Sequence, residues 1–157
     1  EAPTPSSYDY AGGQQEWMRI VAPSPVKPLG LTATQKDLRL IPKRPGSSII
    51  LSGILFSPNS DYFKPASMPE LKRLVQFLTD NPELKVEIGA HTNALLSHAF
   101  ALQLSRNRAA AVVDYLVENG IAKERLEAKA YGKTSPIADN DTPQGRQKNQ
   151  RIELTIL

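Results

Sequence analysis

The sequence has no cysteine, only two histidines, and no apolar run approaching the roughly 18 residues that a membrane-spanning helix needs. The missing cysteines exclude disulfides and thiolate metal sites. His91 and His98 stand seven positions apart with no Asp or Glu between them. A zinc site needs three or four ligands, usually at shorter spacing, so we expect one histidine in a loop after a strand and one at the surface.

Signatures of catalysis are also missing. The chain has no Gly-x-Ser-x-Gly elbow, no P-loop and no Gly-x-Gly-x-x-Gly, so neither a nucleophile nor a phosphate cradle is indicated. Glu83, Glu87, Asp114 and Glu118 are explained as residues on the exteriors of strands and helices. Because no acid, base and nucleophile converge, we predict a protein that is not an enzyme and that uses no metal and no cofactor.

The composition of the 157 residues is that of one soluble domain with a tail, 40% hydrophobic and 22% charged. A net charge of +3 is a mild excess, and no Lys/Arg tract accompanies it. Ordinary surface charge therefore explains the balance. Without a basic stripe or stacking aromatics, we expect no nucleic acid partner.

Residues 1–46 differ from the rest of the chain. They hold seven of the 13 prolines, a density typical of extended, linker-like chain because proline fixes its backbone and lacks a donor. Two apolar pieces interrupt this segment, at residues 17–21 and 38–41, and either would add an edge strand or strap onto the domain, with Trp17 as an anchor. We therefore predict a Pro-rich linker or strap over residues 1–46 and a folded domain over residues 47–157.

The folded part shows alternating strand and helix patterns. Ser67-Met68-Pro69-Glu70 has the form of a capping box at the start of a helix, and Asn119-Gly120 is a helix-stop signal. We expect strands at 49–56, 84–88, 126–131 and 152–156, helices from about 67 to 81 and 97 to 119, and a polar loop with one helical turn at 136–147. The order β-α-β-α-β-(α)-β predicts an α/β fold, a two-layer sandwich.

Polar residues follow the ends of these strands. Asn59 lies in the loop after the first strand, Thr92 and Asn93 follow the second, and Arg108 lies at the border of the apolar face of the long helix. Strand ends that lead into helices are favoured sites for small polar ligands, and a guanidinium matches a carboxylate. Each residue taken alone is equally explained as a turn former, a helix-start residue or a solvated arginine. The pattern by itself predicts no more than a small polar or anionic ligand.

Three stretches form a recognisable pattern: Ala90-His91-Thr92-Asn93 after a strand, residues 101–112 in the long helix, and residues 145–153 before the last strand. With these motifs, the sequence from about Ile49 to Leu157 resembles the OmpA-like (OmpA/MotB C-terminal) peptidoglycan-binding domain, of the type found at the C-terminus of multidomain envelope lipoproteins. The family's Gly-His-Thr-Asp appears as Ala90-His91-Thr92-Asn93. Its Asn-x-x-Leu-Ser-x-x-Arg-Ala-x-x-Val helix motif appears at residues 101–112, and Gly-Arg-x-x-Asn-Arg-Arg-Val-Glu at residues 145–153.

The resemblance implies a non-catalytic domain in the periplasm, associated with the outer membrane, that holds the peptidoglycan stem peptide. In the family an Asp and an Arg grip the amino and carboxylate ends of a diaminopimelate residue, and those positions match Asn93 and Arg108. Other subunits of an envelope or secretion complex are further candidate partners, with membrane contact only through a lipid anchor or a domain outside this chain. The ligand-binding residues that we predict are Asn59, Thr92, Asn93, Arg108, Asn149 and Gln150.

The chain departs from the family pattern at three positions. Asn93 replaces the acid, Ala101 replaces the helix asparagine, and Gln150 replaces the first arginine of the Asn-Arg-Arg run. A neutral hydrogen bond is about half as strong as one to a charged group, so loss of the acid would weaken binding of an ammonium by about tenfold or more. The alternative hypothesis is therefore a degenerate scaffold that makes protein–protein contacts without binding the wall.

Overall fold

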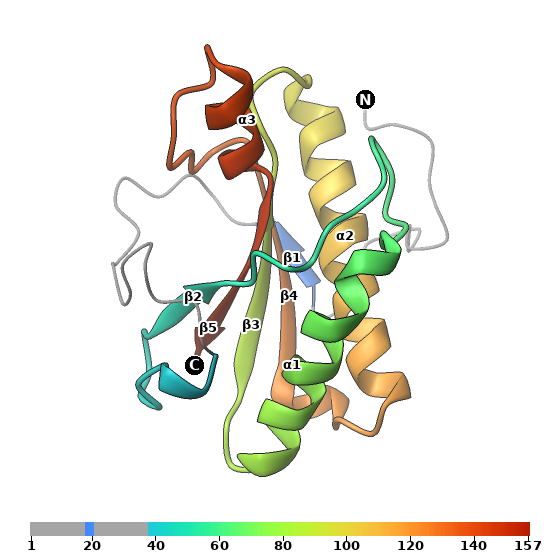
Figure 1. Cartoon of the computed structure of the whole chain (residues 1–157), viewed down its shortest axis with the longest axis vertical. Coiled ribbons are helices and arrows are strands. Elements are labelled where there is room, and N and C mark those ends of the chain that lie inside the picture. The colour runs from blue at the N-terminus through green and yellow to red at the C-terminus, as the bar shows by residue number, and fades with distance from the viewer. Residues whose placement is uncertain (1–17, 21–37) are drawn as a thin grey trace.

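The structure, a computed structural model, describes residues 18–20 and 38–157, and only the backbone of the first segment (Figure 1). Most of the predicted linker or strap, Trp17 included, lies outside the described residues. The strands are β1 Met18–Ile20, β2 Ser48–Ile50, β3 Val86–His91, β4 Leu126–Gly132 and β5 Arg151–Ile156. The helices are α1 Met68–Asp80, α2 His98–Glu118 and α3 Pro143–Asn149, with short 3-10 turns at Leu38–Leu40, Pro65–Ser67 and Lys123–Arg125.

The strands form one five-stranded sheet in the order β1-β4-β3-β5-β2. Strand β4 runs parallel to β1 and β3, whereas β5 runs antiparallel to β3 and β2. Helices α1 and α2 lie together against the sheet (Figure 1). This arrangement confirms the predicted two-layer α/β sandwich. The first of the two apolar pieces forms the edge strand Met18–Ile20, one of the two roles predicted for it. The second piece, at 38–41, instead forms a 3-10 turn with Leu38 and Ile41 buried.

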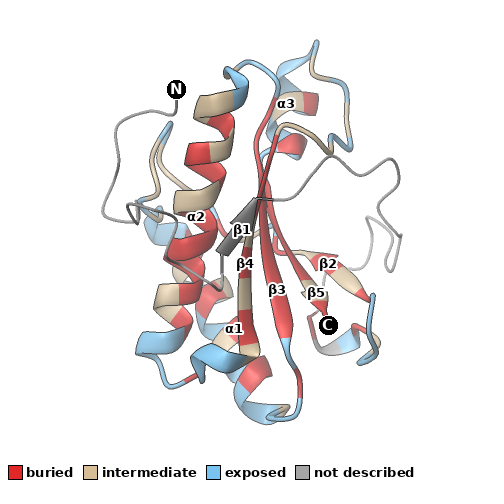
Figure 2. Ribbon diagram, turned by 180° about the vertical axis from the view of Figure 1, so that it is seen from behind, coloured by how far each residue is buried: buried red, intermediate tan, exposed pale blue. Residues whose placement is uncertain are grey.

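The core lies between the sheet and the two long helices. Val86, Ile88 and Ala90 of β3 point into it because alternate residues of a strand face the same side. The helices contribute one apolar stripe each, and Figure 2 shows buried residues along the strands and the inner sides of both helices. The helix residues of the core are Leu71, Leu74, Phe77 and Leu78 of α1, and Ala109, Val112, Val113 and Leu116 of α2.

Helix α2 begins and ends close to where the sequence predicts. The side-chain oxygen of Ser97 accepts a hydrogen bond from the Phe100 N–H at 3.2 Å, which satisfies one of the donors at the start of the helix. Asn119 and Gly120 end it, and Gly120 has a φ of +98°, a conformation that glycine adopts without strain. Within residues 18–20 and 38–157, no helix combines the length and the apolar character needed to cross a bilayer.

Two predictions about the first strand and helix are wrong. Strand β2 covers only residues 48–50, and the chain then turns at residues 52–53 instead of continuing the strand to Phe56. A continuous apolar run shows that its residues are buried but does not show that they pair in a sheet. The capping box is not formed, because the Ser67 hydroxyl instead accepts the Leu55 N–H at 2.8 Å and donates to the Leu55 carbonyl at 2.7 Å.

The expectation of an exterior Glu87 is also wrong. Glu87 lies on the face of the sheet that points away from the helices, yet it is only 5% exposed. Its carboxylate accepts the Tyr131 O–H at 2.6 Å and lies 3.4 Å from Lys129 Nζ. Burial and the Glu87 carboxylate raise the pKa of Tyr131. The Tyr131 ring crosses Gly89, where an added Cβ would lie 2.8 Å from Cε2, and stacks on His91 with centroids 4.5 Å apart. Polar groups on this face are therefore packed and paired.

Candidate functional site

The sheet places the residues after β3 beside those that precede β5. His91 is opposite Arg151 of β5 and opposite Gly132 of β4. Because β3 and β5 are antiparallel, Thr92 leaves the sheet at the edge where Gln150 approaches it. The Thr92 N–H donates to the Gly132 carbonyl at 2.8 Å and continues the pairing one step beyond the strand. Thr92 and Gln150, two of the predicted site residues, thus lie at one edge of the sheet.

Asn93 is nearly enclosed in the loop between β3 and α2, with 7% of its surface exposed. Its Oδ1 accepts the backbone N–H of Leu95 at 2.9 Å, and its carbonyl accepts the Thr92 hydroxyl at 3.2 Å. Nδ2 has no hydrogen-bond partner among the described residues. The side chain therefore supports its own loop through one atom and leaves a donor on the other.

Asn149 ties the loop before α3 to the loop after β3. It is fully buried, and its Oδ1 accepts the N–H groups of Ile137 and Ala138 at 2.7 and 2.9 Å. Its Nδ2 donates to the Ala138 carbonyl and to Asn140 Oδ1, both at 2.9 Å. The same Asn140 oxygen accepts the Ala94 N–H at 3.1 Å. Both polar atoms of Asn149 are thus engaged within the protein.

Gln150 is exposed and ends α3, where its backbone N–H donates to the carbonyls of Arg146 and Gln147. Its side chain has no hydrogen bond to another described residue. Gln150 is therefore free to contact a ligand from the strand edge, whereas the described bonds of Asn149 shape the loop behind it.

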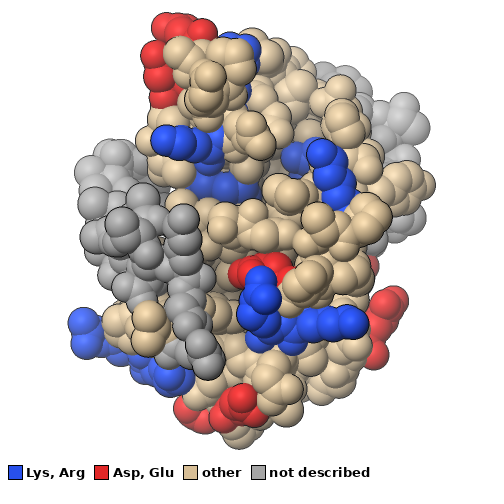
Figure 3. Space-filling model, in the orientation of Figure 1, with Lys and Arg blue, Asp and Glu red and all other residues tan. Residues whose placement is uncertain are grey.

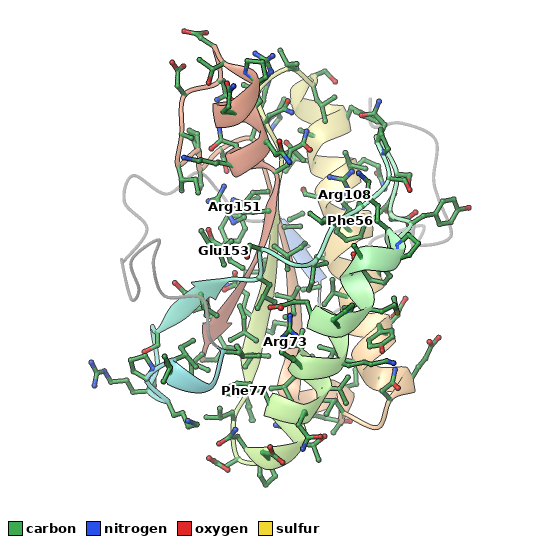
Figure 4. All side chains as sticks on the ribbon, in the orientation of Figure 1. Phe56, Arg73, Phe77, Arg108, Arg151 and Glu153 are labelled. Carbon is green, nitrogen blue, oxygen red and sulfur yellow. The ribbon has the colours of Figure 1, made fainter. Side chains whose placement is uncertain are left out.

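Arg108 reaches from the middle of α2 to the loop after β2. Its Nε donates to the Ser60 carbonyl at 2.8 Å and its Nη2 to the Ser57 carbonyl at 3.2 Å. Its Cζ lies 4.8 Å above the centre of the Phe56 ring (Figure 4). Nη1 has no hydrogen bond to a described residue, so the edge of the guanidinium that carries Nη1 is left for a carboxylate.

The loop that Arg108 holds is a tight turn. The Ser60 N–H donates to the Ser57 carbonyl at 3.1 Å, and Asn59 has a φ of +53°. Proline followed by a residue of positive φ is the composition of a type II turn, in which asparagine is tolerated. Asn59 is exposed at the tip of this turn. The structure therefore brings Asn59 and Arg108 together through the carbonyls on either side of Asn59.

Helix α2 links the Arg108 loop to the strand ends. The Ser105 hydroxyl accepts the Gly132 N–H at 3.0 Å, and the Gly132 carbonyl accepts the Thr92 N–H at 2.8 Å. Arg108 follows Ser105 by one helical turn on the same side, about 4.5 Å along the axis. Sequence reasoning gave Ser105 no role, although its spacing from Arg108 in the helix motif signals a shared face.

Burial lowers the pKa of the Arg108 guanidinium, but the group stays protonated at neutral pH. Desolvation lowers the pKa of Arg108 to about 10, while the nearby Asp61 carboxylate acts in the opposite direction. A cation shielded from water attracts a carboxylate more strongly than an exposed one.

The lysines and arginines on the face of the molecule shown in Figure 3 form separate patches rather than one stripe. Among the described residues, no three His, Asp or Glu side chains group to hold a metal ion.

The fold and the site together define a small α/β domain that presents an arginine and amide groups at one edge of its sheet. Residues 55–150 match the family model described as the OmpA family, so the chain belongs to the OmpA family and the resemblance is confirmed.

Individual relatives extend this comparison. Outer membrane porin F of Pseudomonas fluorescens is 35% identical over 103 residues, which cover 66% of this chain and 32% of the porin. A protein named peptidoglycan-binding protein ArfA, from Mycobacterium bovis, gives the same identity and coverage. The solved structure of the cell wall anchor of the T6SS from Pseudomonas aeruginosa is 25% identical with a TM-score of 0.59, covering 71% of this chain and 79% of that one. The chain spans about a third of the length of the two curated relatives.

Proposed function

We propose that this chain is a non-catalytic domain that binds the peptidoglycan stem peptide through diaminopimelate and so anchors an outer-membrane-associated protein to the cell wall. Membership of the OmpA family and likeness to a peptidoglycan-binding protein and to a cell wall anchor support wall anchoring in general. None of the three proteins compared above, the porin, the peptidoglycan-binding protein and the cell wall anchor, has the name of an enzyme. The periplasm is the compartment in which such a domain meets its ligand.

One observation carries the proposal to a particular site. Arg108 is 6% exposed, still cationic at neutral pH, and has Nη1 unbonded to any described residue, one helical turn from the strand ends. A stem peptide presents a carboxylate that fits this guanidinium. Asn59, Thr92 and Gln150 would contact the rest of the ligand, with Asn93 at its amino end. Asn149 would act by holding the loop beneath them.

Residues 47–157 would form the wall-binding domain, and residues 1–46 would connect it to the membrane-associated part of the protein. A lipid anchor or a domain outside this chain would supply the membrane contact. The likeness to a T6SS anchor makes subunits of a secretion complex the natural protein partners to test.

Co-sedimentation with purified sacculi tests the proposal. Arg108→Met keeps the stem over Phe56 but removes the charge, and we expect it to stay in the supernatant while the parent chain sediments. Arg106→Met is the matched control, because Arg106 lies on the same helix and its hydrogen bond within the described part of the chain goes to Gln103 Oε1, at 3.4 Å. This control should sediment like the parent. If Arg108→Met sediments equally well while circular dichroism shows it folded, the site assignment is wrong.

A protein-binding scaffold is the second candidate. Two observations favour it: Asn93 replaces the family acid, and two nitrogens of Arg108 already bond the protein's own loop. A loop-holding role alone would explain why this arginine is present. A scaffold should not sediment with sacculi at all, and restoring the acid with Asn93→Asp should not change that result. A wall site should instead gain affinity for a ligand with a free ammonium from the restored charge.

A further inference from the structure

The orientation of the Asn93 amide is fixed by its neighbour. The Leu95 backbone N–H can only donate, so the Asn93 atom 2.9 Å from it must be the carbonyl oxygen. The Nδ2 group therefore lies on the opposite side of the amide. It has no hydrogen bond to a described residue. An aspartate in the same orientation would offer a second, anionic acceptor at that place, whereas Asn93 offers two N–H donors.

The other end of the site also presents donors. Arg108 has Nη1 unbonded to any described residue, and the carbonyls of Ser57 and Ser60 are already used by its Nη2 and Nε. Asn140 Oδ1, a side-chain acceptor that bonds the loop after β3, already takes the Ala94 N–H and Asn149 Nδ2. Asp61 acts on Arg108 and follows Ser60, so its charge lies at the Arg108 end rather than beside Asn93.

Among the described residues, these contacts leave unbonded N–H donors on both Arg108 and Asn93, and no hydrogen bond brings a carboxylate to the Asn93 amide. An ammonium has three donors and no acceptor, so it would meet the N–H groups of Asn93 unfavourably. The second lone pair of Oδ1 remains, but an ammonium approaching it also meets the Nδ2 protons. An acylated amine carries no charge and presents a carbonyl oxygen, which can accept from Nδ2 while the neighbouring carboxylate binds Arg108.

We propose that this site prefers the stem peptide whose diaminopimelate side-chain amine is acylated, as at a cross-link, over the peptide with a free amine. This inference rests on the proposed function and specifies its ligand. A gained neutral hydrogen bond corresponds to about a fivefold difference in affinity, and relief of the ammonium–donor contact adds to it.

Calorimetric titration of the 157-residue chain tests the preference with two probes. One is a stem tripeptide containing diaminopimelate with its side-chain amine free, and the other is the same tripeptide with that amine acetylated. We expect the acetylated form to bind the parent chain about fivefold or more tightly. Asn93→Asp keeps the acceptor for Leu95 N–H and restores the charge, so it should reverse the preference. Arg108→Met should lose both ligands.

The outcomes separate the two proposals. If the free-amine peptide binds the parent chain as well as or better than the acetylated one, the preference is wrong while wall binding stands. An unchanged preference in Asn93→Asp would also overturn the assignment of the amine end to Asn93. If neither peptide binds the parent chain or Asn93→Asp, and sacculi do not retain the parent chain, the proposed function itself fails.

Discussion

Replacing Asn149 by alanine should destabilise the domain by about 3 kcal/mol. The side chain makes four hydrogen bonds in a fully buried position, to Ile137, Ala138 and Asn140. Each such bond contributes about 0.5–1.5 kcal/mol. The Ile137 bond is discounted because that residue is 49% exposed and water can replace the lost acceptor. The three remaining bonds give the estimate.

Urea unfolding followed by far-UV circular dichroism measures this loss, as a lower midpoint at an unchanged slope. The melting temperature should fall by about 10 °C. Gln150→Ala is the matched control, because the neighbouring side chain is exposed and has no hydrogen bond to a described residue. It should change stability by less than about 0.5 kcal/mol. A loss below about 1 kcal/mol in Asn149→Ala would refute the reasoning, because it would mean that water or a rearranged loop satisfies the orphaned groups.

Two further predictions concern packing and charge. Gly145→Ala should cost more than about 2 kcal/mol by thermal melting, because the added Cβ would lie 1.7 Å from the Asp139 carbonyl oxygen, and the loop must move. Gly120→Ala, with nothing within 4 Å, should cost only the strain of its positive φ, about 1 kcal/mol, and equal losses would contradict this account. Affinity for the acetylated tripeptide should fall as the pH rises through about 10, where Arg108 loses its proton. An affinity unchanged between pH 8 and roughly 11 would show that this cation does not bind the ligand.

Much of the fold follows from local patterns. The stripe Ala109, Val112, Val113 and Leu116 and the signals at Ser97 and Asn119 are sufficient to define α2, because periodicity and capping are properties of neighbouring residues. Alternation located β3 and β5 for the same reason, although β3 spans Val86–His91 and not the predicted 84–88. The strand predicted at 49–56 is wrong in length because an unbroken apolar run has no periodicity that distinguishes a strand from a buried loop. The predicted capping box at Ser67 is wrong because the Ser67 hydroxyl bonds the backbone of Leu55, twelve positions away. No local pattern encodes such a contact.

The sequence suggests a set of candidate site residues, which stays a prediction, but it does not suggest their contacts. Spacing brought Thr92, Asn93 and Arg108 into consideration. The sheet register places the end of β3 beside the start of β5, and the bond between Ser105 and Gly132 sets α2 beside that edge. The carbonyls that accept hydrogen bonds from Arg108 belong to residues 48 and 51 positions away. The side-chain amide of Asn149 bonds backbone groups of a loop for which the sequence predicts no regular structure. Such bonds depend on which backbone groups the fold leaves unpaired, and that is decided only after the elements have packed.

The most direct test of the central claim is calorimetric titration of the parent chain and of Arg108→Met with the stem tripeptides containing diaminopimelate. We predict saturable binding to the parent chain, tightest for the acetylated form, and no measurable heat of binding with folded Arg108→Met. Equal binding to both proteins, or none to the parent chain with either peptide, would contradict a wall-binding site at Arg108.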